Sequence, residues 1–470
     1  MNFRLKRQLH FCRSHIFRSE VLLRRFDFSI TRSYLALTLP LALGSQLENL
    51  VGFAEIFMVG SLGTEAISAV GISRIIVMVI GITVVSVATG TMTMVAQAVG
   101  AKRWKEASET AKQSVTLVFG ISTAISLFGY WTSDLALDSL SVPDEIRVLA
   151  VPYLQLFFAT VPLMGIQRTL DTCLHASGDT RTPFYISIVA NVCHLIAAYA
   201  LIYGAWGLPR LGVVGAAAGG VAAGVVGNVC RFWVLYSGRF ALTLLPGTSY
   251  IPEKERARRL LKIGIPSALQ GLFRNGSNVV YLKLVAMTAN PTVALAAFSI
   301  GSQMERSLRR SSLAFGTATT SLVGQSLGAG KLEEAEARGW TTLLISVVGL
   351  AILGIPISFF ASYIMAIFTD GKAVIGVGII YLYAMSAAEP FMCWAITSGA
   401  SLRGAGDTMP ALLYTIISQW VIRLPVAYYL AFSLDLDIWG IWVALVIFSA
   451  LQGFLTVRKF AQGHWKSRRI

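Results

Sequence analysis

Long apolar runs constrain this chain more than any other feature. The runs 35–59, 75–96, 149–164 and 343–368 are each nearly free of charge. A helix needs about 20 apolar residues to cross the hydrocarbon core of a bilayer, and most of these runs reach or approach that length. Only 13% of all residues are charged, about half the fraction found in soluble domains. The sequence therefore predicts an all-α membrane protein.

The predicted spans number about twelve, which places both ends of the chain on the same side of the membrane. The net charge is +15, and basic residues gather in alternate loops and at both ends. By the positive-inside rule both termini are expected to be cytoplasmic in a cell (inner or plasma) membrane. The positive charge is then explained by the orientation of the chain in the membrane, and no nucleic-acid partner is predicted. The expected spans start near residues 33, 67, 112, 148, 183, 212, 259, 293, 339, 375, 409 and 437.

An internal repeat organises the spans into two halves. VAQAVGAKRWKEA at 95–107 matches VGQSLGAGKLEEA at 323–335, and LHASGDT matches LRGAGDT, both at an offset of 228 residues. Pro162 and Pro390 obey the same offset. The GDT strings are expected to be turns whose Asp or Thr caps the next helix, with a gating role as the alternative. The glycine-rich run 215–224 is expected to be a close-packing face of the sixth span. Because each unit holds an even number of spans, the halves are parallel repeats. The sequence predicts two pseudo-symmetric six-helix bundles that work by alternating access.

These features divide the chain into lobes and flanking segments. The N-terminal segment is rich in arginine and poor in acids, which is typical of an interfacial helix or of a transit peptide. The five cysteines are scattered without metal-ligand spacing, so they are expected to be packing residues. The predicted parts are a basic cytoplasmic segment 1–32, an N-lobe 33–237, a cytoplasmic linker 238–257, a C-lobe 258–458 and a basic cytoplasmic tail 459–470.

Ionisable residues inside predicted spans are candidates for function because they are costly in the bilayer. Glu48 and Glu55 are two helical turns apart, so they share a face of the first span that is expected to point into the bundle. Either carboxylate could carry a proton, ligate Na⁺ or form a static ion pair. Asn191 and His194 lie one turn apart in the fifth span. His194 could pair with Glu55, titrate itself or make an ordinary interhelical hydrogen bond.

The second half carries more positive than negative charge in its predicted spans. Glu305 and Arg309 have helical i, i+4 spacing and are expected to neutralise each other. Fixed positive charge in a water-filled cavity would favour anionic groups. The candidate residues of this C-lobe cavity are Arg274, Glu305, Arg309 and Glu389, and the other cations are Lys283, Arg306, Arg310 and Arg423.

The motifs AEIFMVGSLGTEAISAVG at 54–71, VALAAFSIGSQME at 293–305, ASGDTRTP and LRGAGDTMP resemble the multidrug and toxic compound extrusion (MATE) family. The resemblance covers about residues 33–457 and is to the prokaryotic branch that includes DNA-damage-inducible protein F. In that family, cationic or amphipathic compounds leave the cell in exchange for Na⁺ or H⁺. The resemblance therefore implies the same fold and activity for this chain.

The resemblance assigns site residues only where the motif positions match. The first-span aspartate of the family falls on Glu55, so the carboxylate is kept. The fifth-span N-x-x-x-D pair falls on His194 and Ala198, so this chain has a histidine for the asparagine and lacks the aspartate. A seventh-span glutamate of some relatives falls on Arg274. The resemblance thus implies a coupling site at Glu55, with Glu48, Asn191 and His194 as neighbours.

The leading prediction is a secondary transporter that exports small organic, cationic or amphipathic compounds in exchange for H⁺ or Na⁺, with Na⁺ placed near Glu55. No other cofactor or metal is expected. The expected partners are small-molecule substrates and membrane lipids, and the chain is predicted to be a monomer. The alternative is a flippase of a lipid-linked or polyprenyl-phosphate precursor. A third hypothesis is a non-transporting channel or scaffold protein, for which duplicated bundles with buried carboxylates are not needed. The chain lacks a nucleophile–base cluster and a phosphate loop, so no enzyme is predicted.

Overall fold

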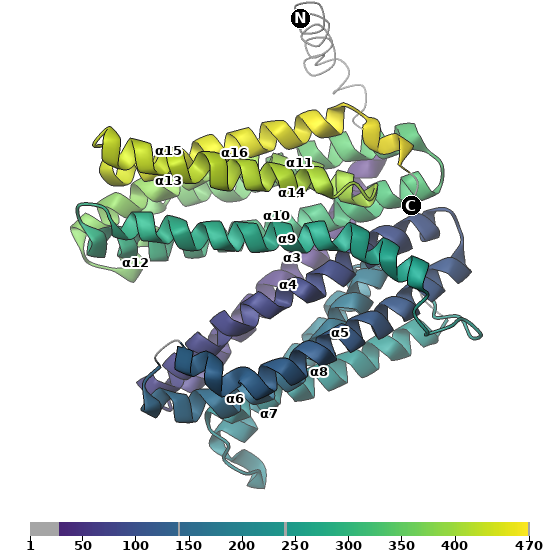
Figure 1. The fold of residues 1–470 in the computed structure, drawn as a ribbon, viewed down its shortest axis with the longest axis horizontal. Helices are drawn as coiled ribbons and strands as arrows, with labels where there is room; N and C mark the ends of the chain where they lie inside the picture. The colour runs from purple at the N-terminus through teal and green to yellow at the C-terminus, as the bar shows by residue number, and fades with distance from the viewer. Residues whose placement is uncertain (1–27, 140–141, 239–241, 469–470) are drawn as a thin grey trace, which may run out of the picture. The chain divides into compact units, whose positions relative to one another are not determined.

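The computed structural model describes residues 28–139, 142–238 and 242–468, and these residues form a helical protein (Figure 1). Nearly all of the predicted basic segment 1–32 and Cys12 fall outside the described residues. The first half contains α3 (Phe28–Gly60), α4 (Thr64–Gly100), α5 (Trp104–Ser139), α6 (Asp144–Ala176), α7 (Arg181–Tyr203), the short turn η1 (Ala205–Gly207) and α8 (Val213–Tyr236).

The second half repeats this order of elements. One helical run, 409–433, is divided into α14, η2, α15 and η3 because its middle and end adopt π-helical turns. The elements are α9 (Lys254–Ala286), α10 (Pro291–Gly328), α11 (Leu332–Phe359), α12 (Ala361–Phe368), α13 (Lys372–Gly404), α14 (Met409–Ile416), η2 (Ile417–Arg423), α15 (Leu424–Tyr428), η3 (Tyr429–Ser433), α16 (Asp437–Ala461) and η4 (His464–Ser467).

The prediction of about twelve helices agrees with this architecture. When α12 is taken as the end of α11, and 409–433 as one span, twelve helical runs occur in the described part of the chain. Each predicted start lies within eight residues of an observed one. Eight described helices are long and apolar enough to cross a membrane. Among the others, α10 is long enough but carries charges near its middle.

The internal repeat is visible in the backbone hydrogen bonds. The amide of Asp179 donates to the carbonyl of Leu174 at 3.0 Å, and that of Asp407 donates to Leu402 at 2.9 Å, which is the same bond 228 residues later. Both helices end before a glycine with positive φ, Gly178 or Gly406, as in many C-terminal caps. The predicted turns are therefore present in both halves.

The first GDT turn also caps the next helix. The side chain of Asp179 accepts a 3.0 Å hydrogen bond from the amide of Thr182, in the first turn of α7. Such a bond satisfies one of the amides that a helix start leaves open. The role predicted for this aspartate is confirmed.

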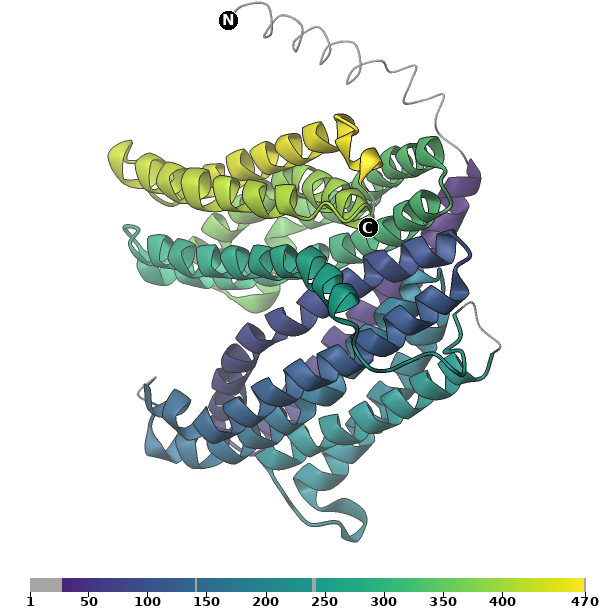
Figure 2. The same cartoon turned by 45° about the vertical axis from the view of Figure 1, so that its right-hand side comes forward.

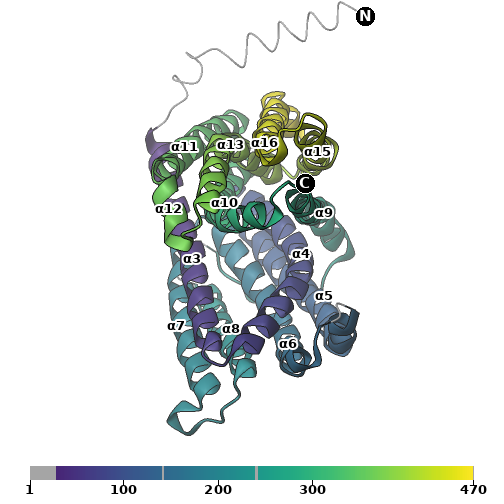
Figure 3. The same cartoon turned by 90° about the vertical axis from the view of Figure 1, so that its left-hand side faces the viewer.

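One compact unit comprises residues 37–272. Within it, α7 and α8 pack together closely (Figure 3). A side chain on Gly215 would meet the backbone of Leu201 at 2.6 Å, and one on Gly219 would meet Ala198 at 2.8 Å. The glycines of α8 therefore form the close-packing face that the sequence predicted.

The second compact unit comprises residues 273–470 and the start of α3. Within it, α13 packs against α10, α11 and α16, and Figures 1 and 2 show α16 running beside α13. The hydroxyl of Tyr34, at the start of α3, donates to the carbonyl of Phe315 at 3.1 Å. The predicted lobe boundaries, 33–237 and 258–458, stay predictions.

The segments that follow the sixth span of each half are anchored to that half. In the linker, the carbonyl of Leu245 accepts a 2.9 Å hydrogen bond from the Nζ atom of Lys112, a buried residue of α5. In the tail, Trp465 is buried and stacks on Phe460. Arg468 makes a 3.1 Å ion pair with Asp407 of the second GDT turn. The described part of the basic tail is thus packed rather than free.

Candidate functional site

Glu55 is buried in the unit 37–272, where its side chain is 7% exposed. One turn later on α3, Val59 packs in an apolar cluster with Ala198 of α7 and Ala216 of α8. The end of α3 is also joined to α7 by a 3.0 Å hydrogen bond from the Tyr203 hydroxyl to the carbonyl of Met58. α3 and α7 are therefore neighbours around Glu55.

His194 lies on α7 at about the depth of Glu55. Spans one and five run in the same direction, and His194 precedes Ala198 by one turn, as Glu55 precedes Val59. The Nε2 atom of His194 is buried and has no hydrogen-bond partner among the described residues. The two side chains are thus at similar depth but are not hydrogen-bonded to each other. Asn191, one turn before His194, is half-buried.

Glu48 has a different environment from Glu55. Its side chain is exposed on this unit, and its Oε2 atom lies 3.5 Å from the Nη2 atom of Arg168. Such a long and exposed ion pair adds little stability. The structure therefore brings Glu55, Asn191 and His194 to neighbouring helices, whereas Glu48 is part of a separate surface pair.

Ala198, the position that matches the aspartate of the family motif, has no room for a carboxylate. It is fully buried, and α8 approaches it closely at Gly219, where an added side chain would meet Ala198 at 2.8 Å. A larger side chain would have to displace the backbone of α8. The loss of the aspartate is therefore matched by tight packing of the two helices.

A buried ion pair between Asp171 and Arg231 was missed by sequence reasoning. Arg231 Nε donates to Asp171 Oδ1 at 2.6 Å, and Arg231 Nη2 donates to Oδ2 at 3.1 Å. Arg231 is fully buried. Arg231 lies near the end of the sixth span, where the sequence alone does not distinguish it from the basic residues of a cytoplasmic loop. Its partner is apparent only from the contact of α8 with α6. Asp171 is therefore a structural residue rather than an open site.

In the second unit, Glu305 is held by two partners. It forms the predicted ion pair with Arg309, one turn later on α10, and accepts a 2.5 Å hydrogen bond from the hydroxyl of Tyr381 on α13. The neutralisation expected from the i, i+4 spacing is present. The tyrosine, which the sequence did not single out, ties α10 to α13.

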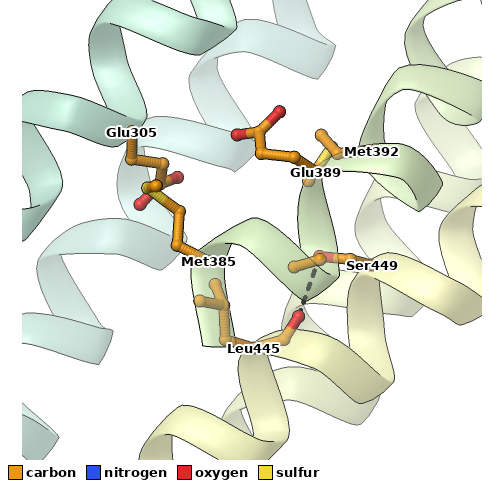
Figure 4. A pocket seen from close by; sticks show the side chains of 7 residues that line it. Glu305, Met385, Glu389, Met392, Leu445 and Ser449 are labelled. Carbon is orange, nitrogen blue, oxygen red and sulfur yellow. Dashed lines mark hydrogen bonds between the residues drawn. The ribbon is translucent and has the colours of Figure 1, made fainter. Parts of the chain in front are cut away.

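Glu389 lies beside Glu305 in a small cavity (Figure 4). The cavity has a volume of about 10 Å³, which is room for about one water molecule. Glu389 is 4% exposed, and its Oε2 atom has no hydrogen-bond partner in the described structure. The other lining residues are Met385, Ala388, Met392, Leu445 and Ser449.

Arg423, on the π-helical segment η2, is buried against aromatic rings. Its guanidinium carbon lies 3.7 Å from the ring centre of Tyr281 and 4.7 Å from that of Phe448. Its Nη1 atom donates to Asn278 at 2.8 Å. Cation–π contacts of this kind stabilise a buried guanidinium. Arg274, by contrast, is half-buried and makes no ion pair among the described residues.

No cluster of three or more histidine, cysteine or carboxylate residues that could hold a metal ion occurs among the described residues. The model of the MatE family matches residues 40–200 and 266–429, one segment in each half of the repeat. The chain belongs to the MatE family. Membership identifies it as a multi-pass membrane transporter rather than an enzyme.

Similar proteins cover nearly all of this MatE protein. An uncharacterized transporter YisQ of Bacillus subtilis is 27% identical over 96% of this chain and 97% of its own length. A probable multidrug resistance protein NorM of Thermotoga maritima is 27% identical over 94% of both chains. These relatives agree with the family that the MatE model shows, whereas the predicted branch around DNA-damage-inducible protein F stays a prediction.

Solved structures confirm the fold of this MatE protein. An outward-facing multidrug resistance transporter of the MATE family superposes with a TM-score of 0.84, at 21% identity over 92% of this chain and 96% of that one. A MOP superfamily transporter from Pyrococcus furiosus, whose binding pocket is described as having reverse polarity, also gives 0.84, at 20% identity over 92% and 95%. At these identities the likeness shows the fold.

Proposed function

We propose that this protein exports small amphipathic organic compounds across the cell membrane in exchange for H⁺ or Na⁺. The observation that supports the proposal best is Glu55, a carboxylate buried inside a span next to a helix that carries His194 with an unpartnered ring nitrogen. Burying a carboxylate inside a bilayer costs free energy, so such a residue usually has a function. In transporters that function is commonly ion coupling.

Transport would proceed by alternating access of the two halves, with both termini in the cytoplasm. The parallel repeat supports this mechanism because such transporters bind substrate between related halves. A proton or Na⁺ bound at Glu55 would neutralise its charge, and release of the ion would favour the opposite conformation. The protein would act as a monomer surrounded by lipid.

Relatives named as multidrug resistance proteins support organic substrates. The sequence predicted cationic or amphipathic compounds, and the excess of arginine over carboxylate in the second half favours amphipathic compounds over simple cations. None of the relatives described above is named as a flippase of lipid-linked precursors, so that alternative gains no support.

Substitution of Glu55 by glutamine tests the proposal. In proteoliposomes with an imposed pH or Na⁺ gradient, Glu55→Gln should lower ion-driven dye transport at least tenfold while protein yield is unchanged. Glu65→Gln is the matched control, because Glu65 is an exposed carboxylate at the start of α4. Undiminished transport by Glu55→Gln would show that the coupling site lies elsewhere.

A further inference from the structure

Two arginines are exposed near the middle of α10. The helix has 38 residues, and Arg306 and Arg310 are the sixteenth and the twentieth of them. About 20 residues span the hydrocarbon core, so both positions lie near the membrane midplane when the middle of this helix crosses the core. An arginine that faced lipid at this depth would cost several kcal/mol. We therefore expect this side of the helix to face water rather than lipid.

Neither arginine is neutralised by a carboxylate of the described part of the chain. No ion pair to Arg306 or Arg310 is present among the described residues. The nearest carboxylate in sequence, Glu305, is engaged by Arg309 and by the hydroxyl of Tyr381. The two arginines are also spaced i, i+4, so they repel each other and destabilise an isolated helix. The surface thus carries about two positive charges that no described carboxylate pairs with.

Arg306 is held in place by neutral groups. Its Nε and Nη2 atoms donate to the Oε1 atom of Gln303 at 3.1 and 2.7 Å, and its Nη1 atom donates to the hydroxyl of Ser302 at 2.9 Å. These bonds orient the guanidinium and leave its charge intact. A guanidinium fixed in this way loses little side-chain entropy when a carboxylate or phosphate binds.

We infer that Arg306 and Arg310 bind an anionic group, such as a carboxylate, of the exported compound. Charge-assisted hydrogen bonds from arginine to such groups are short, directional and about twice as strong as neutral ones. The inference rests on the proposed export function and narrows its substrate class to amphipathic organic anions. A simple organic cation would be repelled by this surface.

The inference can be tested with two dyes of opposite charge. The protein is reconstituted into vesicles of phosphatidylcholine alone, which carry no anionic headgroup, and transport of carboxyfluorescein and of ethidium is followed under pH and Na⁺ gradients. Wild-type protein should move carboxyfluorescein. Arg306→Gln and Arg310→Gln should each reduce this transport about tenfold, as expected for loss of one charge-assisted contact. The control, Lys372→Gln, removes an exposed charge at the start of α13 and should have no effect.

The outcomes separate the inference from the function on which it rests. Transport of ethidium but not of carboxyfluorescein by the wild type would overturn the inference and leave the export function standing. Transport of neither dye under either gradient would overturn both. Arg306→Lys keeps the charge and should retain most carboxyfluorescein transport. If it loses as much as Arg306→Gln, the residue has a structural role and the inference is wrong.

Discussion

The hydroxyl of Ser126 donates a 2.7 Å hydrogen bond to the backbone carbonyl of Phe158. Pro162 has no amide hydrogen, so this carbonyl lacks the donor that an uninterrupted helix would supply. In the second half, Ser386, on the helix that contains Pro390, donates to the carbonyl of Gly354 at 3.3 Å. Both pairs occupy the same positions of the repeat, with donor and acceptor exchanged. Serine therefore ties the proline-containing helix to its neighbour in each half.

Loss of the Ser126 hydroxyl should destabilise the first unit. Ser126→Ala leaves a buried carbonyl without a partner, which costs about 1–3 kcal/mol. The expected result is a lower midpoint of thermal unfolding for the detergent-solubilised protein. Ser139→Ala is the control, because the Ser139 hydroxyl bonds within its own helix at an exposed position. Equal midpoints for the two variants would contradict the role given to Ser126.

The buried pair of Asp171 and Arg231 predicts an unequal response to single and double substitution. Asp171→Asn leaves a fully buried arginine without its counter-charge, which should cost about 3–5 kcal/mol. The double variant Asp171→Leu, Arg231→Met removes both charges and should recover most of that loss. Thermal unfolding and the yield of monodisperse protein measure both effects. A double variant less stable than Asp171→Asn would argue against this account.

Lys102 is strained at a position where the second repeat has glycine. Its φ is 57°, and that of Gly330, 228 residues later, is 75°. A side chain in this left-handed region costs about 1 kcal/mol. Lys102→Gly should therefore leave stability unchanged or raise it by up to about 1 kcal/mol, and Gly330→Lys should lower it. Unfolding midpoints that move in the opposite directions would show that Lys102 makes a compensating contact.

Restoring the aspartate of the family motif should not restore a binding site. Ala198→Asp places a carboxylate against the backbone of α8 at Gly219, where no space exists. The expected result is a loss of a few kcal/mol in stability, from burial of an unpaired charge and overpacking, with no gain in ion-driven transport. Ala197→Asp is the control, since Ala197 is only half-buried. Faster transport by Ala198→Asp would mean that α7 and α8 separate more easily than their packing indicates.

Local patterns predicted the spans, the repeat and the GDT turns because each depends on residues close in the chain. An apolar run of sufficient length forms a spanning helix wherever it lies, and a glycine followed by aspartate ends one helix and caps the next. The pair of Glu305 and Arg309 belongs to the same class, because i, i+4 spacing alone brings the two side chains together.

Tertiary structure decided which charged side chains are buried and which partner each one has. Asp171 forms an ion pair with Arg231 from α8, and Glu305 accepts a hydrogen bond from Tyr381 of α13. Glu48 shares a helical face with Glu55, yet its side chain is exposed. The spacing of residues in the sequence shows which side of its helix a residue occupies. It does not show which other helix packs against that side. Sequence alone therefore determined a twelve-span transporter with charged residues at membrane depth. Only the packing of helices from distant parts of the chain decided which of those charges are buried and which are paired.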